Sequence, residues 1–257
     1  MVWVGTSWKM NGTLSFAREY AESLAGAGME TYVRAEVQPF VIPPFTALNT
    51  AAKALAETPV LVGAQNAHWE DAGAWTGEVS VPQAADAGAR IIEMGHSERR
   101  EWFGETDETV NLKAKAALRH GLVPLICFGE PAEVFEAGET LPFICSQIDA
   151  ALAGLPAAGE GETGPRVLLA YEPIWAIGEH GRPPAREDLV TTFAALAERY
   201  GERVTAILYG GSVNHANNQD ILSIPGVGGL FIGRSAWTAE GYLKNLELAR
   251  EYQEQRG

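Results

Sequence analysis

The sequence contains few cysteines and no long hydrophobic run. Of its 257 residues only Cys127 and Cys145 are cysteines, so at most one disulfide is available, and we expect both thiols to be reduced. No stretch approaches the roughly 18 consecutive apolar residues of a membrane-spanning helix. The first six residues lack the basic and apolar regions of a signal peptide. These absences predict a cytoplasmic protein with no membrane partner.

Basic residues are also scarce. The chain has 19 Lys and Arg against 33 Asp and Glu, a net charge of −14. This charge disfavours binding to nucleic acid or to anionic membranes, although an anionic small molecule can still bind through helix N-termini and a single lysine. The composition is 46% hydrophobic and 20% charged, and neither a low-complexity tract nor a long linker divides the chain. We therefore expect one domain, residues 1–257.

Strand-like and helical segments alternate along the whole length. The expected strands are residues 2–8, 37–42, 60–64, 90–94, 123–128, 167–171, 204–209 and 227–232. The expected helices are residues 15–25, 46–56, 82–87, 109–120, 132–153, 186–200, 214–223 and 239–252. Eight repeats in about 250 residues predict an α/β fold, a parallel eight-stranded (β/α)₈ barrel with outer helices. A doubly wound open sheet is the alternative, but its Gly-x-Gly-x-x-Gly turn after the first strand is missing.

The carboxyl end of the sixth strand carries a glutamate. The apolar run 167–170 predicts a buried strand, and Pro173 stops strand pairing directly after Glu172. The apolar segment 174–177 and the Gly- and Pro-rich stretch 178–184 follow. This pattern is typical of a lid that excludes water, which would make the carboxylate beneath it a stronger base. The alternative is a helix-capping glutamate beside an ordinary surface loop.

Two other strand ends carry a lysine and a histidine. Lys9 could hold an anion, or it could be an ordinary surface lysine. His96 precedes a helix opening, where the helix N-terminus lowers the imidazole pKa and favours a neutral hydrogen-bond donor; a structural histidine is the alternative. Glu98 could pair with Lys9, and Arg99 could pair with Glu105.

Glycine-rich turns follow the last two strands, where barrels often bind phosphate on backbone N–H groups. The turns are Tyr209-Gly210-Gly211-Ser212-Val213-Asn214 and Gly228-Gly229-Leu230-Phe231-Ile232-Gly233-Arg234-Ser235. Two such turns together predict a phosphate site.

The loop from Gln65 to Glu78 carries two tryptophans, Trp69 and Trp75. Because such a loop would be a poor monomer surface, we expect it to dock into a partner subunit and form a homodimer. Alternatively, both side chains fold back on their own barrel.

Together these motifs resemble the triosephosphate isomerase family over nearly the whole chain. The matching segments are Trp8-Lys9-Met10-Asn11-Gly12, Gly63-Ala64-Gln65-Asn66, Gly95-His96-Ser97-Glu98-Arg99-Arg100, Tyr171-Glu172-Pro173-Ile174-Trp175-Ala176-Ile177-Gly178 and Tyr209-Gly210-Gly211-Ser212-Val213.

The resemblance implies a role for each matching residue. Glu172 would be the base, His96 the neutral electrophile, Lys9 the cation that complements substrate charge, and Glu98 the group that orients Lys9. A base paired with a neutral histidine is a known feature of this family. Tyr209 and Ser212 would latch a lid made of Pro173, Ile174, Trp175, Ala176, Ile177 and Gly178. The substrate and its phosphate would be bound by Ser7, Gly178, Gly211, Ser212, Gly233 and Arg234. No metal or cofactor is required.

Three features depart from the family pattern. Ser7 stands where the family has asparagine, which removes an amide donor and opens space beside the reacting carbons. Arg234 stands where the family usually has glycine. Residues 179–184 replace the usual small and basic hinge, and two prolines stiffen that end of the lid. Segments 5–9 and 232–237 are similar to a branch of the family that isomerises erythrulose phosphates.

The resemblance therefore implies a small phosphorylated sugar as substrate and an enediolate intermediate. Family frequency favours interconversion of glyceraldehyde 3-phosphate and dihydroxyacetone phosphate, a step of glycolysis and gluconeogenesis. The alternative is isomerisation of L-erythrulose 1-phosphate to D-erythrulose 4-phosphate. This substrate has one more carbon, and the short side chain of Ser7 leaves space for it in the pocket. A phosphate-binding barrel without turnover is disfavoured, because a binder does not need Glu172 as a base. An aldolase that uses a Schiff base needs a desolvated amine, whereas Lys9 beside Glu98 would stay charged.

Overall fold

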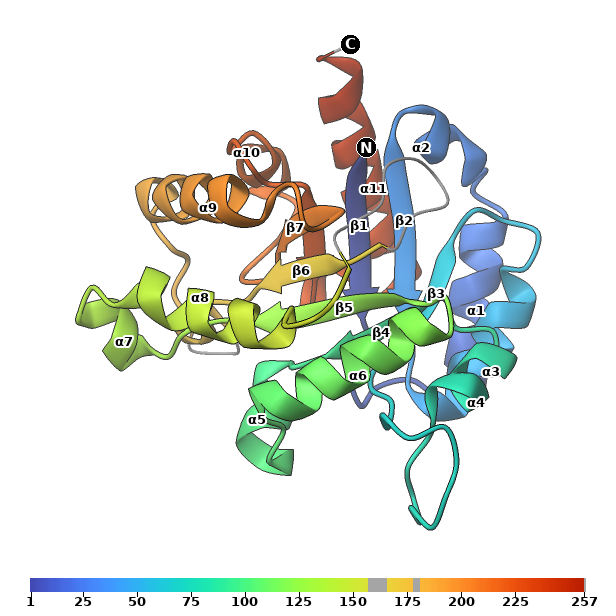
Figure 1. Ribbon diagram of the computed structural model, residues 1–257. Helices are drawn as coiled ribbons and strands as arrows, with labels where there is room; N and C mark the ends of the chain where they lie inside the picture. The colour runs from blue at the N-terminus through green and yellow to red at the C-terminus, as the bar shows by residue number, and fades with distance from the viewer. Residues whose placement is uncertain (157–165, 178–180, 257) are drawn as a thin grey trace.

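Eight strands pair in chain order and close into a barrel, as the sequence predicts (Figure 1). The computed structural model describes residues 1–156, 166–177 and 181–256. The strands are β1 Val2–Ser7, β2 Val37–Ile42, β3 Leu61–Ala64, β4 Ile91–Met94, β5 Val123–Phe128, β6 Leu168–Tyr171, β7 Ala206–Tyr209 and β8 Gly229–Ile232. Every strand pair is parallel, so all carboxyl ends meet at one mouth.

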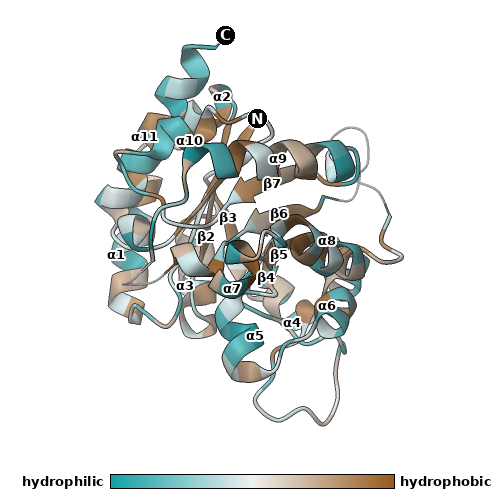
Figure 2. Cartoon of the chain, turned by 90° about the vertical axis from the view of Figure 1, so that its left-hand side faces the viewer, coloured by the Kyte–Doolittle hydropathy of each residue, from teal (hydrophilic) through white to brown (hydrophobic). Residues whose placement is uncertain are grey.

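Helices surround the barrel. They are α1 Leu14–Ala25, α2 Glu30–Arg34, α3 Phe45–Ala54, α4 Val81–Asp86, α5 Ser97–Phe103, α6 Asp107–Arg119, α7 Ala132–Glu136, α8 Thr140–Ala151, α9 Arg186–Tyr200, α10 Asn218–Leu222 and α11 Ala239–Glu254, with short 3₁₀ turns η1 Ile174–Ala176 and η2 Arg234–Ala236. Figure 2 shows hydrophilic residues on the outer surfaces of α5 and α11 and hydrophobic residues along the strands. No helix in the described part of the chain is long and apolar enough to span a membrane.

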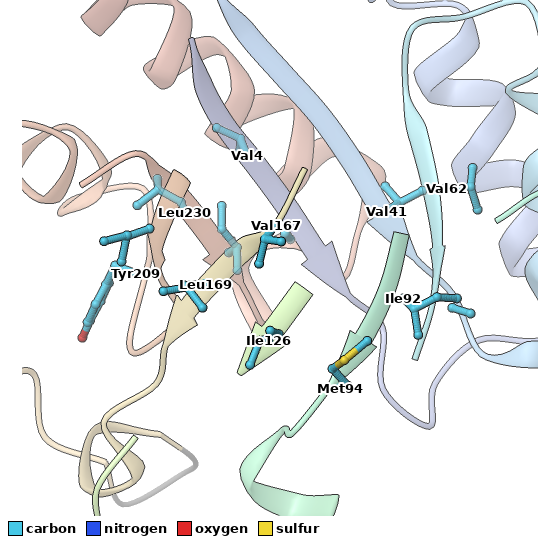
Figure 3. Packing of buried hydrophobic residues seen from close by; sticks show 14 of the residues in the cluster. Val4, Val41, Val62, Ile92, Met94, Ile126, Val167, Leu169, Tyr209 and Leu230 are labelled. Atoms are coloured by element: carbon cyan, nitrogen blue, oxygen red, sulfur yellow. The ribbon is translucent and has the colours of Figure 1, made fainter. Parts of the chain in front are cut away.

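The strands bury both faces. Because side chains alternate along a strand, every second residue points into the barrel and the others point to the helices. The inner cluster includes Trp3, Phe40, Leu125, Leu208 and Phe231. The outward residues pack under the helices, and Figure 3 shows part of this layer: Val4, Val41, Val62, Ile92, Met94, Ile126, Val167, Leu169, Tyr209 and Leu230.

Two glycines leave space inside the barrel that a side chain would fill. A Cβ atom at Gly229 would lie 2.0 Å from the carbonyl oxygen of Trp3, so only glycine lets β8 approach β1 and close the barrel. A Cβ atom at Gly5 would lie 2.0 Å from Cζ of Phe40, whose ring occupies that space. The barrel below the mouth is therefore filled by side chains, as in other barrels of this size.

The helix boundaries differ from the expectation in several places. The single helix expected over 132–153 is two helices, α7 and α8, because Gly138 between them has φ +74°. The helix expected over 214–223 is confined to α10, because the Asn214 side chain accepts the N–H groups of Ala216 and Asn217 and holds a turn there. Helices α2 and α5 are additional, although α5 begins at the expected opening, Ser97.

Candidate active site

The carboxyl ends of the strands surround a cavity of about 670 Å³. Its wall includes the sequence-predicted residues Ser7, Lys9, His96, Glu98, Glu172, Gly211, Ser212, Gly233 and Arg234, and the lid residues Ala176 and Ile177. Gly178, also predicted for this site, lies outside the described residues. Residues that are far apart in the sequence thus lie close together, because the carboxyl ends of all parallel strands are at the same end of the barrel.

Glu172 follows β6 and is almost completely buried. Burial raises the pKa of its carboxyl well above the ordinary value, and the nearby carboxylate of Glu93 raises it further. Its Oε2 atom has no hydrogen-bond partner among the described residues and lies 3.7 Å from Nε2 of His96. Glu172 is therefore a carboxylate of increased basicity with one oxygen uncommitted.

His96 caps the start of α5 and is buried beside Glu172. Its Nδ1 accepts the backbone N–H of Glu98 at 3.2 Å, so the proton of the neutral ring is on Nε2. Burial lowers the pKa of His96 to about 4, and the positive charge of Lys9 contributes. The helix N-terminus invoked from the sequence thus fixes the tautomer, while burial causes most of the shift. At neutral pH the ring is uncharged and can donate a hydrogen bond through Nε2.

Lys9 is the second residue after β1 and has a left-handed backbone conformation, with φ +52°. Its Nζ lies 2.6 Å from Oε1 of Glu98, which is the ion pair expected from the sequence. Burial alone would raise the pKa of Glu98, but the hydrogen bond and charge of Lys9, with His96, lower it overall, so Glu98 is ionised. The second expected pair, Arg99 with Glu105, is also present at 2.8 Å.

The glycine-rich segments after β7 and β8 lie against each other on one side of the cavity. Ser235 Oγ donates to the carbonyl of Val213 at 2.9 Å, and the Asn217 side chain donates to the carbonyl of Ser212 at 2.9 Å. The Trp237 indole donates to the carbonyl of Ser7 at 3.0 Å and joins these segments to β1. These contacts fix the backbone around the predicted phosphate site.

The described part of the predicted lid forms the turn η1. The Trp175 indole donates to Oε1 of Glu130 at 2.9 Å, and its ring lies 4.2 Å from the ring of Phe135 on α7. The Arg182 guanidinium stands 5.2 Å from the Trp175 ring centroid. The Tyr171 hydroxyl also donates to Oε1 of Glu130 at 3.0 Å. Glu130 therefore anchors the lid tryptophan.

Sequence reasoning missed Glu93 altogether. This residue points into the barrel from β4, is 3% exposed, and accepts a hydrogen bond from Ser7 Oγ at 2.8 Å. Burial raises the pKa of Glu93 to about 7. The available signal was a single charged residue inside an otherwise apolar strand, Ile91-Ile92-Glu93-Met94, at an inward position.

The two tryptophans of the loop from Gln65 to Glu78 differ in burial. Trp69 packs against the outer core, whereas Trp75 is 48% exposed. The His68 ring lies between them, 4.2 Å from Trp69 and 4.3 Å from Trp75. One tryptophan thus folds back on its own barrel and the other remains accessible.

A parallel eight-stranded barrel with an acid, a neutral histidine and a lysine at its mouth defines a class of sugar-phosphate isomerases. The family model described as triosephosphate isomerase matches residues 2–249. The chain belongs to the triosephosphate isomerase family and is an isomerase.

Two individual relatives and one solved structure are similar to the chain over nearly its whole length. The L-erythrulose-1-phosphate isomerase of Mycolicibacterium smegmatis is 58% identical over 253 residues, covering 96% of this chain and 93% of the relative. The L-erythrulose-1-phosphate isomerase of Mesorhizobium japonicum is 50% identical, covering 96% of each chain. The crystal structure of triosephosphate isomerase from Bartonella henselae superimposes with a TM-score of 0.80 at 30% identity, covering 97% of this chain and 99% of that one.

Proposed function

We propose that the protein isomerises L-erythrulose 1-phosphate to D-erythrulose 4-phosphate through an enediolate. The relatives from Mycolicibacterium smegmatis and Mesorhizobium japonicum carry the name of this activity and are 50% identical or more, which supports the four-carbon substrate over the three-carbon one favoured by family frequency. The observation that carries the proposal is Ser7, a small side chain on the cavity wall at the position where the family has asparagine.

The reaction moves the carbonyl from C2 to C3. Glu172 takes the proton from C3, the carbon beside the carbonyl, and returns it to C2. The Nε2–H of His96 donates to the carbonyl oxygen and passes protons between the two oxygens of the enediolate. The 3.7 Å separation of Glu172 Oε2 and His96 Nε2 supports this division of roles, because both groups can reach adjacent atoms of one small molecule.

Lys9 supplies a positive charge beside the reacting groups. Its ammonium group faces the cavity while Glu98 holds it at 2.6 Å, so it complements the developing oxyanion and the substrate phosphate. Glu98 acts as the group that orients Lys9. No step in this scheme uses a metal ion or an organic cofactor.

The phosphate is bound by Gly211, Ser212, Gly233 and Arg234, and Gly178 completes this set in the family pattern. The four described residues line one side of the cavity and come from the adjacent ends of β7 and β8. Backbone N–H groups in glycine-rich segments suit the three acceptor oxygens of a phosphate. In the family pattern, the lid residues 173–178 are latched by Tyr209 and Ser212 and exclude water when substrate is bound.

One assay tests the proposed function. The same preparation is given L-erythrulose 1-phosphate and dihydroxyacetone phosphate, and kcat/KM is measured for both. We expect the four-carbon substrate to be preferred by at least about tenfold. A preference for dihydroxyacetone phosphate would instead support the triose phosphate reaction of the Bartonella henselae relative, and no turnover of either would support a phosphate-binding barrel.

We further propose a homodimer formed through the loop from Gln65 to Glu78. Large apolar side chains follow the ends of β1, β3 and β4: Met10 is 96% exposed, Trp75 48%, Trp102 71% and Phe103 69%. Figure 1 and Figure 2 both show α5 and this loop at the same end of the molecule, where a partner subunit would cover them. The cytoplasmic location expected from the sequence stays a prediction.

A further inference from the structure

Ser7 and Glu93 are joined across the inside of the barrel. They come from β1 and β4, which are not neighbours in the sheet, and Ser7 Oγ lies 2.8 Å from Oε2 of Glu93. Both side chains are at least 95% buried, at 5% and 3% exposure. Ser7 lines the cavity wall, whereas Glu93 lies behind it.

This contact limits what Ser7 can offer to the cavity. A serine hydroxyl has one hydrogen and two lone pairs. When Glu93 is ionised, as it mostly is at pH 8, the hydrogen of Ser7 is donated to it and only lone pairs remain for a bound molecule. A hydrogen bond to a carboxylate also strengthens the accepting power of the donor oxygen. Ser7 therefore presents an acceptor, whereas an asparagine at this position would present an N–H donor as well.

The substrate under the proposed function carries a matching donor. L-erythrulose 1-phosphate differs from dihydroxyacetone phosphate by a terminal hydroxymethyl group on the carbon that loses its proton. That group lies at the end of the substrate away from the phosphate. Ser7 ends β1, and its hydroxyl is directed toward Glu93 on β4, the strand opposite β8 in the order of the closed barrel, whereas the phosphate segments follow β7 and β8. The charged groups near Glu93 are Lys9, Glu98, Glu105 and Glu172. Among the described residues, Ser7 is the one neighbour that donates a hydrogen bond to Glu93.

We propose that Ser7 and Glu93 together form a subsite that accepts a hydrogen bond from the terminal hydroxyl of the four-carbon substrate. Glu93 is a positioning residue in this arrangement, since it acts through Ser7 and does not touch the substrate. The inference rests on the proposed function, because it assigns a specificity determinant to that reaction. A purely structural or general electrostatic role of Glu93 would change the turnover of all substrates by the same factor.

The first test needs no variant. Wild-type enzyme is assayed at pH 8 with L-erythrulose 1-phosphate and with its 4-deoxy analogue, which has a methyl group in place of the hydroxymethyl group. We expect kcat/KM to be roughly 10- to 100-fold higher for the hydroxylated substrate. Equal values for the two compounds would overturn the subsite, while turnover of L-erythrulose 1-phosphate would still uphold the proposed function. Absence of any turnover would overturn both.

Variants then assign the discrimination to the two residues. Ser7→Ala removes the acceptor, so the ratio between the two compounds should fall to about 1. Glu93→Gln removes the charge and should reduce the ratio roughly three- to tenfold, whereas Glu93→Asp, which keeps the charge, should retain more of it. In Ser7→Ala/Glu93→Gln the second change should have no further effect on the ratio, because Glu93 acts through Ser7.

Thr6→Val is the matched control. Thr6 precedes Ser7 on β1, is fully buried, and does not line the cavity. Removal of its hydroxyl should leave the ratio at the wild-type value. A Glu93→Gln enzyme with lower turnover but an unchanged ratio would show that Glu93 does not act through Ser7, and the proposal would be wrong.

Discussion

Gly210 packs directly against the side chain of Glu172 at the mouth of the barrel. A Cβ atom at position 210 would lie 2.7 Å from Cγ of Glu172 and 3.2 Å from its Oε1. The end of β7 therefore lacks a side chain at the point where the end of β6 places its carboxylate, and the position of the base depends on that glycine.

Gly210→Ala should displace the Glu172 carboxylate by about 1 Å. We expect kcat to fall roughly 100-fold, because proton transfer depends steeply on the distance between reacting atoms. Steady-state kinetics checks this, with Gly26→Ala as the control, since a Cβ atom at Gly26 would meet only backbone oxygens at 3.5 and 3.8 Å. A Gly210→Ala enzyme with wild-type kcat would show that the contact does not constrain the base.

Glu172→Asp should preserve the fold and substrate binding but lower kcat by about 100-fold or more. The shorter side chain withdraws the carboxylate by one methylene from the carbon that loses its proton. Circular dichroism monitors the fold and kinetics separates kcat from KM. Glu57→Asp, the same change at an exposed turn, is the control. Unchanged turnover would remove Glu172 from the mechanism.

Ser7→Asn should shift the preference toward dihydroxyacetone phosphate. The larger side chain occupies the space beside the reacting carbons and restores an amide donor. We expect the ratio of kcat/KM for the four-carbon over the three-carbon substrate to fall at least about tenfold. Competition between the two substrates in one reaction measures this ratio directly. If the preference does not move, Ser7 does not determine substrate length.

Glu93 should make the stability of the protein depend on pH. Its folded-state pKa of about 7 lies above the ordinary value of 4.5, so its protonated form favours the folded state. This contribution is fully present below about pH 4.5 and is lost as pH rises through about 7. Between pH 5 and pH 8 wild type should lose about 2 kcal/mol of unfolding free energy relative to Glu93→Gln, which cannot ionise.

Urea unfolding of both proteins at the two pH values measures this difference. The comparison with Glu93→Gln matters because His96, with a pKa lowered to about 4, contributes in the opposite direction: its share is present above its ordinary pKa and is lost as pH falls through about 4. That share is common to both proteins. A difference between them that is constant with pH would contradict the raised pKa of Glu93.

Trp75→Asp should convert a dimer into a monomer. The half-exposed indole is the largest accessible apolar group of the loop from Gln65 to Glu78, and a charge there opposes burial in an interface. Light scattering at micromolar concentration gives the mass. Val190→Asp is the control, because Val190 is also an exposed apolar residue but lies on α9, away from this loop. A monomeric wild type would contradict the dimer.

Local sequence signals predicted the barrel well. The strands at 37–42 and 123–128 match β2 and β5 residue for residue, because short, mainly apolar segments bounded by turns leave little alternative in a parallel sheet. The break between α7 and α8 was missed because the apolar residues before and after Gly138 continue the helical pattern. Where a run is interrupted by one glycine, only packing decides whether the helix continues.

The site was predictable to the extent that its residues stand at strand ends. Lys9, His96 and Glu172 follow β1, β4 and β6, so the fold class alone brings them to one mouth. Glu93 could not be assigned in this way, because it is inside a strand and its partner Ser7 is 86 residues away. Which inward residues face each other across a barrel depends on strand stagger, and no local pattern of the sequence specifies that.

Lys9 holds its ammonium group over the cavity from a backbone conformation with φ +52° that lysine rarely adopts. Such a conformation costs on the order of 1 kcal/mol relative to glycine or asparagine. A screen for heat resistance that ignores activity would therefore enrich Lys9→Asn and Lys9→Gly, and it would recover robust proteins that no longer turn over the sugar.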